Sequence, residues 1–239
     1  MNGQSVAARL AAQICRAVAE PVADRKVIHE VERVLLDSLA CALGATDSPS
    51  VRAARAWAGR IAGSPSATLL GTGGKSSALG AALVNSTMVR DLDLNDTYFS
   101  RNPAHSSDNL GTCLAVGEAE GASAGEIINS ILVAFEVQMR ACEFTRKSFF
   151  KETGWDQTTL VTLASAAAAG VLLRLDPSRM AHALAIAGCY PGIGEMRVGQ
   201  LSMMKAASAG LAATRVVEAA YLAAAGRTGP REAFEGQRG

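Results

Sequence analysis

The sequence is poor in aromatic residues, which make up 5% of its 239 residues, while alanine is abundant. Strands are enriched in aromatic and β-branched residues, whereas alanine has the highest helix propensity. The composition therefore argues against a β-sandwich and favours closely packed helices. Hydrophobic residues make up 49% of the chain, which is enough for a substantial core.

Neither sign of charge predominates, since the formal net charge is +1 and no acidic or basic block occurs. An electrostatic surface for nucleic acid is therefore not expected. The longest uncharged stretch, residues 157–173, is shorter than the roughly 20 apolar residues that cross a bilayer. The first five residues lack the basic region and apolar run of a signal peptide. We expect a soluble, cytoplasmic protein with no membrane or nucleic-acid partner.

The five cysteines are scattered, and none forms a CxxC pair. An iron–sulfur cluster normally requires a tighter thiolate motif, and no spacing of His, Cys and Asp indicates a metal site. Most of these cysteines lie in apolar stretches, which favours buried free thiols. We therefore expect no bound metal.

Apolar residues recur at steps of three and four along almost the whole chain, as expected for helices with one buried face. The pattern predicts an all-α, multi-helix antiparallel bundle-like domain, with a trace of strand near residues 67–70. The predicted helices are 4–19, 24–44, 49–61, 75–89, 108–120, 124–146, 157–173, 177–188 and 203–225. Ser123 to Glu126 reads as a capping box, Asp176-Pro177 as a helix start and Gly226 as a helix stop.

Two glycine clusters resemble nucleotide-binding motifs without matching them. Residues 71–76 end in Gly-Lys-Ser, but a Walker A motif needs glycine where Leu69 stands. Gly188, Gly192 and Gly194 do not follow a strand in the order GxGxxG. Both clusters are interpreted as turns or loops near helices.

The densest polar segment runs from Asp91 to Tyr98 and is followed by His105 to Asn109. A solvated loop tolerates such clustered carboxylates, but crowding also shifts their pKa values and can supply an acid or a base. His105 lies beside this cluster, where an imidazole can titrate near neutral pH. Asp108 and Asn109 have a second explanation as helix N-caps.

Lys205 opens an alanine-rich helix, with Arg197 shortly before it. A lysine is electrostatically disfavoured in a first helical turn, although a surface lysine there costs little. Together, a lysine and a helix N-terminus can bind a carboxylate. The sequence leaves open whether Lys205 is such a site or an ordinary surface residue.

Five segments together resemble the MmgE/PrpD (2-methylcitrate dehydratase-like) family, and they occur in the family's order over nearly the whole chain. They are AALVNSTMVRDLDLNDT (81–97), HSSDNLG (105–111), GWDQTT (154–159), KAASAG (205–210) and FEGQRG (234–239). Ser106 stands where the family usually has proline, and Asp156 stands where some members, notably the decarboxylase, have histidine.

The resemblance implies a cofactor-independent lyase, a dehydratase acting on a small hydroxy-polycarboxylate such as a 2-methylcitrate-like acid. It places Asp93, Thr97, His105 and Lys205 at the pocket. We assign acid and base duty to Asp93 and His105 without deciding which is which. We assign substrate binding to Thr97, Asp156, Arg197 and Lys205, and we expect no cofactor. Asp156 argues against the decarboxylase activity.

The resemblance also implies that residues 1–239 form the helical domain, and that the family's smaller α+β domain, which completes the pocket, is absent from this chain. The expected partners are a polycarboxylate substrate and a second copy in a homodimer, or a separate chain that resembles the C-terminal domain. Two alternatives stay open. One is an epimerase, isomerase or decarboxylase acting on a related polycarboxylate, and the other is a non-catalytic helical subunit that needs a partner chain.

Overall fold

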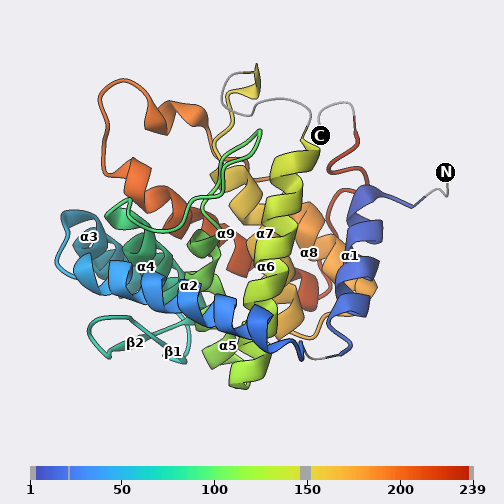
Figure 1. Ribbon diagram of the computed structural model, residues 1–239, viewed down its shortest axis with the longest axis horizontal. Coiled ribbons are helices and arrows are strands. Elements are labelled where there is room, and N and C mark those ends of the chain that lie inside the picture. The colour runs from blue at the N-terminus through green and yellow to red at the C-terminus, as the bar shows by residue number, and fades with distance from the viewer. Residues whose placement is uncertain (1–3, 21, 146–151, 237–239) are drawn as a thin grey trace.

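The computed structural model describes residues 4–20, 22–145 and 152–236, and this part of the chain is predominantly α-helical (Figure 1). The all-α prediction is therefore confirmed. The helices are α1 (Val6–Ala17), α2 (Arg25–Gly44), α3 (Pro49–Ala58), α4 (Ala78–Asp91), α5 (Leu110–Ala119), α6 (Ala124–Phe144), α7 (Thr158–Leu172), α8 (Pro177–Ala187) and α9 (Met204–Ala224).

Each predicted helix has a counterpart in the structure, and two boundaries differ by three residues: α3 ends at Ala58 and not at residue 61, and α4 begins at Ala78 and not at residue 75. Residues 75–89 were predicted as one helix, but Lys75–Ser76 form a short strand, β2, that pairs antiparallel with β1 (Ala67–Thr68). The glycines between the two strands make the turn, since Gly71 and Gly73 have φ values of 76° and 67°. Residue 146, at the end of another predicted helix, lies outside the described residues.

The predicted helix boundaries have the expected chemistry. The Ser123 hydroxyl accepts from the Glu126 N–H, and the Glu126 carboxylate accepts from the Ser123 N–H, which completes the capping box of α6. Asp176 caps α8 ahead of Pro177. Gly226 follows α9 with a φ of 95°.

Helix α4 lies at the centre of the fold and packs against α2, α3, α5 and α9. Every residue from Gly80 to Arg90 is buried, so this helix has no solvent face. Two glycines permit the close crossings. A Cβ atom at Gly111 of α5 would lie 2.3 Å from the Ser86 N atom, and one at Gly210 of α9 would lie 2.2 Å from the Thr87 Oγ1 atom.

The loops that follow α4 and precede α9 lie at the same end of the molecule, the upper end in Figure 1. The first covers residues 92–105 and leads into a short 3₁₀ helix, η1 (Ser106–Asn109). The second covers residues 188–203 and contains another, η3 (Gly194–Arg197). Among the described helices, none is both long and apolar enough to cross a membrane.

Candidate functional site

Asp93 and Lys205 meet at this end of the molecule, although 112 positions separate them in sequence. The Lys205 Nζ atom, in the first turn of α9, donates to the Asp93 Oδ2 atom at 2.6 Å. The two side chains are 33% and 44% exposed, so solvent reaches this ion pair. Asp93 has a φ of 57°, in the left-handed region that aspartate adopts more readily than most residues.

Thr97 and His105 lie opposite each other at the base of a loop. The loop is closed by Tyr98 and Ala104, whose backbone groups form two hydrogen bonds of 2.8 and 3.1 Å. The His105 Nδ1 atom lies 2.7 Å from the Asp96 carbonyl oxygen and 3.3 Å from the Thr97 Oγ1 atom. A carbonyl oxygen can only accept, so we assign the proton of neutral His105 to Nδ1. The lone pair of Nε2 is then the one available for proton transfer.

Asp156 and Arg197 form a second ion pair, which is almost completely buried. The Arg197 guanidinium donates from Nε to one Asp156 oxygen and from Nη2 to the other at 3.0 Å, a two-pronged contact. The Asp156 side chain is fully buried and that of Arg197 is 15% exposed. Backbone bonds between the Gly154–Asp156 segment and the loop before η3 hold the two residues together. Asp156 also accepts from the Thr158 N–H, at the start of α7.

A largely buried network starts at the Asp93–Lys205 pair, and its central residues were not among the predicted site residues. The Asp108 carboxylate accepts from the Asn95 Nδ2 atom at 3.1 Å and from the Gln157 Nε2 atom at 2.9 Å. The Arg90 Nη1 atom donates both to Asp93 and to the Asn95 Oδ1 atom. The sequence signal for this network is Arg90, a charged residue that follows an uncharged run, residues 76–89.

The electrostatics of the three carboxylates differ. Partial burial opposes ionisation of Asp93, but Lys205 and Arg90 outweigh it, so the pKa of Asp93 is lowered from its ordinary value of 3.8. Burial likewise opposes ionisation of Asp156, and Arg197 outweighs it, so the pKa of Asp156 is also lowered. Burial raises the pKa of Asp108, although Arg90 and His105 act against it.

Two interpretations of the polar segment need correction. Asp108 and Asn109 do not cap α5 with their side chains. The Asn109 Nδ2 atom donates to the Ser106 carbonyl oxygen and to Gln138. The Asp108 carboxylate accepts from Asn95 and Gln157, as described above. The clustered carboxylates are also not simply solvated. Asp96 accepts from the Ser106 and Ser107 N–H groups and so caps η1.

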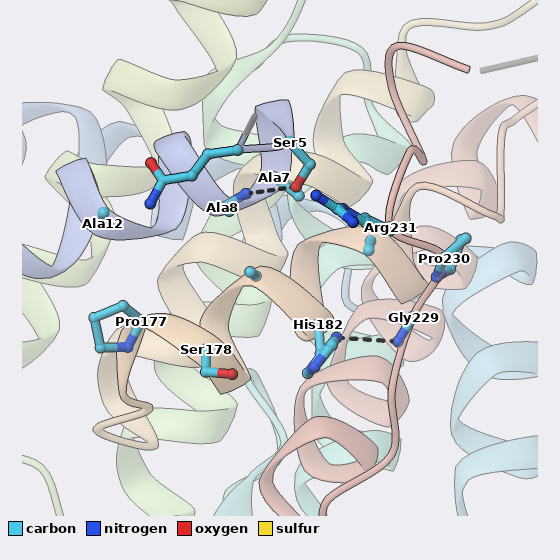
Figure 2. Close-up of a pocket in the computed structure, with 13 residues that line it drawn as sticks. Ser5, Ala7, Ala8, Ala12, Pro177, Ser178, His182, Gly229, Pro230 and Arg231 are labelled. Atoms are coloured by element: carbon cyan, nitrogen blue, oxygen red, sulfur yellow. Dashed lines mark hydrogen bonds between the residues drawn. The ribbon is translucent and has the colours of Figure 1, made fainter. Parts of the chain in front are cut away.

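Two cavities lie away from these residues. One, of about 480 Å³, lies between α1, α8 and residues 229–231, where the His182 Nδ1 atom accepts from the Gly229 N–H (Figure 2). The other, of about 390 Å³, is an apolar groove between α3, α4 and the start of α9. Its lining includes the exposed side chains of Trp57, Met203, Met204 and Leu211. None of the six predicted site residues lines either cavity.

The six predicted site residues thus form three contacting pairs, and Arg90 extends the Asp93–Lys205 pair into a buried network. Arg197 is also close enough to Asp108 and Asp93 for both to raise its pKa, although burial opposes this and Asp156 contributes most. The closing segment that carried part of the family resemblance continues into residues 237–239, which lie outside the described residues.

Comparison with known proteins identifies the family. The 2-methylcitrate dehydratase of Salmonella typhi is 29% identical over 166 residues, which are 64% of this chain and 33% of that protein. The 2-methylcitrate dehydratase-like protein oryR of Aspergillus oryzae is 29% identical over 62% of this chain and 32% of its own length. The 2-methylcitrate dehydratase of Cupriavidus necator is 31% identical over 45% of this chain and 24% of its own length.

The matched region is thus about a third of the length of these curated relatives or less. The model of the MmgE/PrpD N-terminal domain matches residues 8–239, which is almost the whole chain. This chain therefore belongs to the MmgE/PrpD family, and residues 8–239 correspond to its N-terminal domain.

Proposed function

We propose that this chain provides the helical part of a cofactor-independent dehydratase that acts on a small hydroxy-polycarboxylate. The observation that carries the proposal is the solvent-accessible Asp93–Lys205 pair, whose Asp93 lies on the same loop as Thr97 and His105. Dehydration of such an acid requires a base next to a carboxylate, an acid for the departing hydroxyl and a cation for the substrate's other carboxylates. The chain has side chains suited to each task at this end of the fold.

Lys205 is paired with Asp93 in the free protein, and in this proposal a substrate carboxylate displaces Asp93 from it. An exposed ion pair is worth little, so exchanging one carboxylate for another costs little. The exchange frees the Asp93 carboxylate from one of its two cations and makes it a stronger proton acceptor. We therefore assign the base to Asp93. This assignment links substrate binding to activation of the base.

His105 takes the second proton-transfer role in this proposal. Its Nδ1 atom is occupied by the Asp96 carbonyl oxygen, which fixes the ring and leaves Nε2 to carry or give up a proton. Thr97, on the other side of the loop closure, orients the substrate or the imidazole through its hydroxyl group. Both side chains lie on the same loop as Asp93, residues 92–105, so one backbone segment positions all three groups.

Asp156 and Arg197 contribute differently from Lys205 in this proposal. Removing Arg197 from Asp156 would leave a fully buried carboxylate without its cation, which is strongly unfavourable. We propose that this pair remains intact and shapes the edge of the site, while Lys205 takes part in the exchange. The substrate-binding role of Arg197 is then electrostatic and indirect.

The first test is binding of citrate to the purified chain by calorimetry. Lys205→Met should weaken citrate binding at least about tenfold, because a charge-assisted hydrogen bond is lost. Lys75→Met is the matched control, since Lys75 pairs with Glu118 on the surface, away from the site. Equal citrate affinity in wild type and Lys205→Met would contradict the proposal.

The second test is turnover, measured with this chain alone and together with a chain that supplies the remaining length of its relatives. We expect little turnover from this chain alone. Loss of water with formation of a double bond supports a dehydratase. Exchange of the substrate's C–H hydrogen with solvent deuterium, without loss of water, indicates an epimerase or isomerase. Release of carbon dioxide indicates a decarboxylase. Binding of the second chain with no reaction on any polycarboxylate indicates a non-catalytic subunit.

A further inference from the structure

Arg90 is a buried cation near the end of the central helix α4, and its side chain is 3% exposed. A buried charge is unfavourable unless hydrogen bonds and an opposite charge compensate for it. Two carboxylates lie beside this guanidinium, Asp93 towards the surface and Asp108 towards the interior. The Asp93–Lys205 pair is therefore only the outer part of a longer chain of charges.

Arg90 holds Asp93 through both its backbone and its side chain. The Asp93 N–H donates to the Arg90 carbonyl oxygen at 3.1 Å, and the Arg90 Nη1 atom donates to the Asp93 Oδ1 atom. Lys205 binds the other carboxylate oxygen, Oδ2. Asp93 keeps one cation on each oxygen while its backbone has a φ of 57°. Loss of Lys205 from this arrangement leaves the Arg90 contacts in place.

The inner side of Arg90 is fixed by a separate set of contacts. The Asn95 side chain accepts from Arg90 at 3.0 Å and donates to Asp108 at 3.1 Å, so it bridges the two charged groups. The Arg90 Nε atom lies 3.9 Å from the Asp108 Oδ2 atom and has no hydrogen-bond partner. Gln157 binds the same Asp108 oxygen at 2.9 Å. Arg90 is thus also held on its inner side, through the buried Asn95 that links it to Asp108.

We propose that Arg90 is a positioning residue that holds the Asp93 carboxylate in its reactive orientation after a substrate carboxylate has displaced it from Lys205. The need for such a residue rests on the proposed function, in which Asp93 and Lys205 separate. The contacts of Arg90 do not depend on that function. Asp93 then keeps one cation throughout, so it stays ionised and can accept a proton.

The test uses Lys205→Met, in which Asp93 has permanently lost its contact with the lysine. The carboxyl carbon signal of Asp93 is followed by NMR over a pH titration, which gives its pKa. With Arg90 present, the pKa of Asp93 should stay below 3.8, its ordinary value. Replacing the buried pair as well, with Arg90→Met and Asp108→Leu, should raise the pKa of Asp93 to that value or above it. Substituting both partners avoids leaving one buried charge alone.

Glu118 provides an internal control in the same spectra, because Lys75 lowers its pKa and none of the changes involves that pair. If the pKa of Asp93 reaches 3.8 or more in Lys205→Met alone, Arg90 does not hold the carboxylate and the proposal is wrong. A second measurement needs no variant. Saturating the wild-type chain with citrate should shift the Lys205 Nζ signal and leave the Arg90 Nη1 protons protected from exchange with water.

Loss of that protection on adding citrate would also contradict the proposal. Absence of citrate binding would instead contradict the proposed function, and the titration of Lys205→Met would still decide the role of Arg90. Arg90→Lys gives a further readout, since lysine keeps the charge but not the fork that contacts Asp93 and Asn95 together. It should change citrate affinity by less than about threefold while raising the pKa of Asp93.

Discussion

At the residue scale, the ion pairs of this chain differ mainly in how deeply they are buried. Asp156 and Arg197 form a pair that is nearly inaccessible, whereas Arg174 and Glu126 are 62% and 43% exposed. Breaking a buried pair leaves a charge that solvent cannot compensate, whereas an exposed partner is simply rehydrated. An arginine–carboxylate contact therefore has very different consequences at the two sites.

We predict that Asp156→Asn lowers the free energy of unfolding by about 3 kcal/mol, because it removes the buried charge but keeps an oxygen for the Thr158 N–H. Arg174→Gln, which breaks the exposed pair, should cause a much smaller loss. Urea denaturation of the three proteins measures both effects. Similar losses in the two variants would show that the buried pair has no special role.

This destabilisation should depend on pH. The pKa of Asp156 is lower in the folded chain than its ordinary value of 3.8, since Arg197 outweighs the effect of burial. The contribution of a carboxylate with a lowered pKa is fully present above its unfolded pKa and is lost as the pH falls through its folded pKa. The difference in unfolding free energy between wild type and Asp156→Asn should therefore be constant near neutral pH and shrink below pH 3.8. A difference that grows on acidification contradicts this.

At the element scale, the position of α9 on α4 determines whether Lys205 reaches Asp93. Gly210 lies at this crossing, where a Cβ atom would be 2.2 Å from the Thr87 Oγ1 atom and 2.5 Å from the Leu83 carbonyl oxygen. We predict that Gly210→Ala destabilises the fold by about 1–3 kcal/mol through overpacking and weakens citrate binding, because α9 must move. Denaturation and calorimetry measure the two effects.

Gly125→Ala is the matched control, since Gly125 lies in the first turn of α6 with nothing near its missing Cβ atom. Alanine is the better helix former, so this change should stabilise the chain slightly or leave it unchanged. If Gly210→Ala behaves like Gly125→Ala, the two helices can adjust without disturbing the site.

The helices were predictable because apolar periodicity and caps are local signals, as the capping box at Ser123 and the Asp176-Pro177 start illustrate. The strand at Lys75–Ser76 was missed because its pairing with Ala67–Thr68 depends on a turn and not on periodicity. The site residues were named from family resemblance and local polarity. Their pairing was not predictable, because Asp93 and Lys205 meet only through the packing of α4 against α9.

Arg90 and Asp108 were missed as site residues for the same reason. In the sequence, Arg90 ends an apolar stretch and Asp108 resembles a helix cap, and either position is usual at the protein surface. Only the packed structure shows that both are buried and that Asn95 bridges them. An arginine at the end of an uncharged helical run is the pattern that would have indicated Arg90, whereas no such run precedes Asp108.

At the scale of the whole molecule, the apolar groove between α3, α4 and α9 exposes large apolar side chains to solvent. Trp57, Met203 and Met204 line it and are 57%, 58% and 42% exposed. Exposed apolar patches of this kind usually mark a surface that another protein covers. We propose that a second copy of this chain covers the groove, which would make the groove the interface of the expected homodimer.

We predict that the purified chain self-associates in a concentration-dependent way, and that Met203→Ser together with Met204→Ser shifts it towards monomer. The reason is that each serine loses the favourable burial of the methionine side chain that it replaces in the dimer. Sedimentation velocity at several concentrations measures the effect. Leu36→Ser is the control, because Leu36 is 71% exposed on α2 and does not line the groove. A wild-type chain that remains monomeric at all concentrations would show that the groove does not mediate a homodimer. An equal shift in Leu36→Ser would show that general surface hydrophobicity, and not the groove, drives the association.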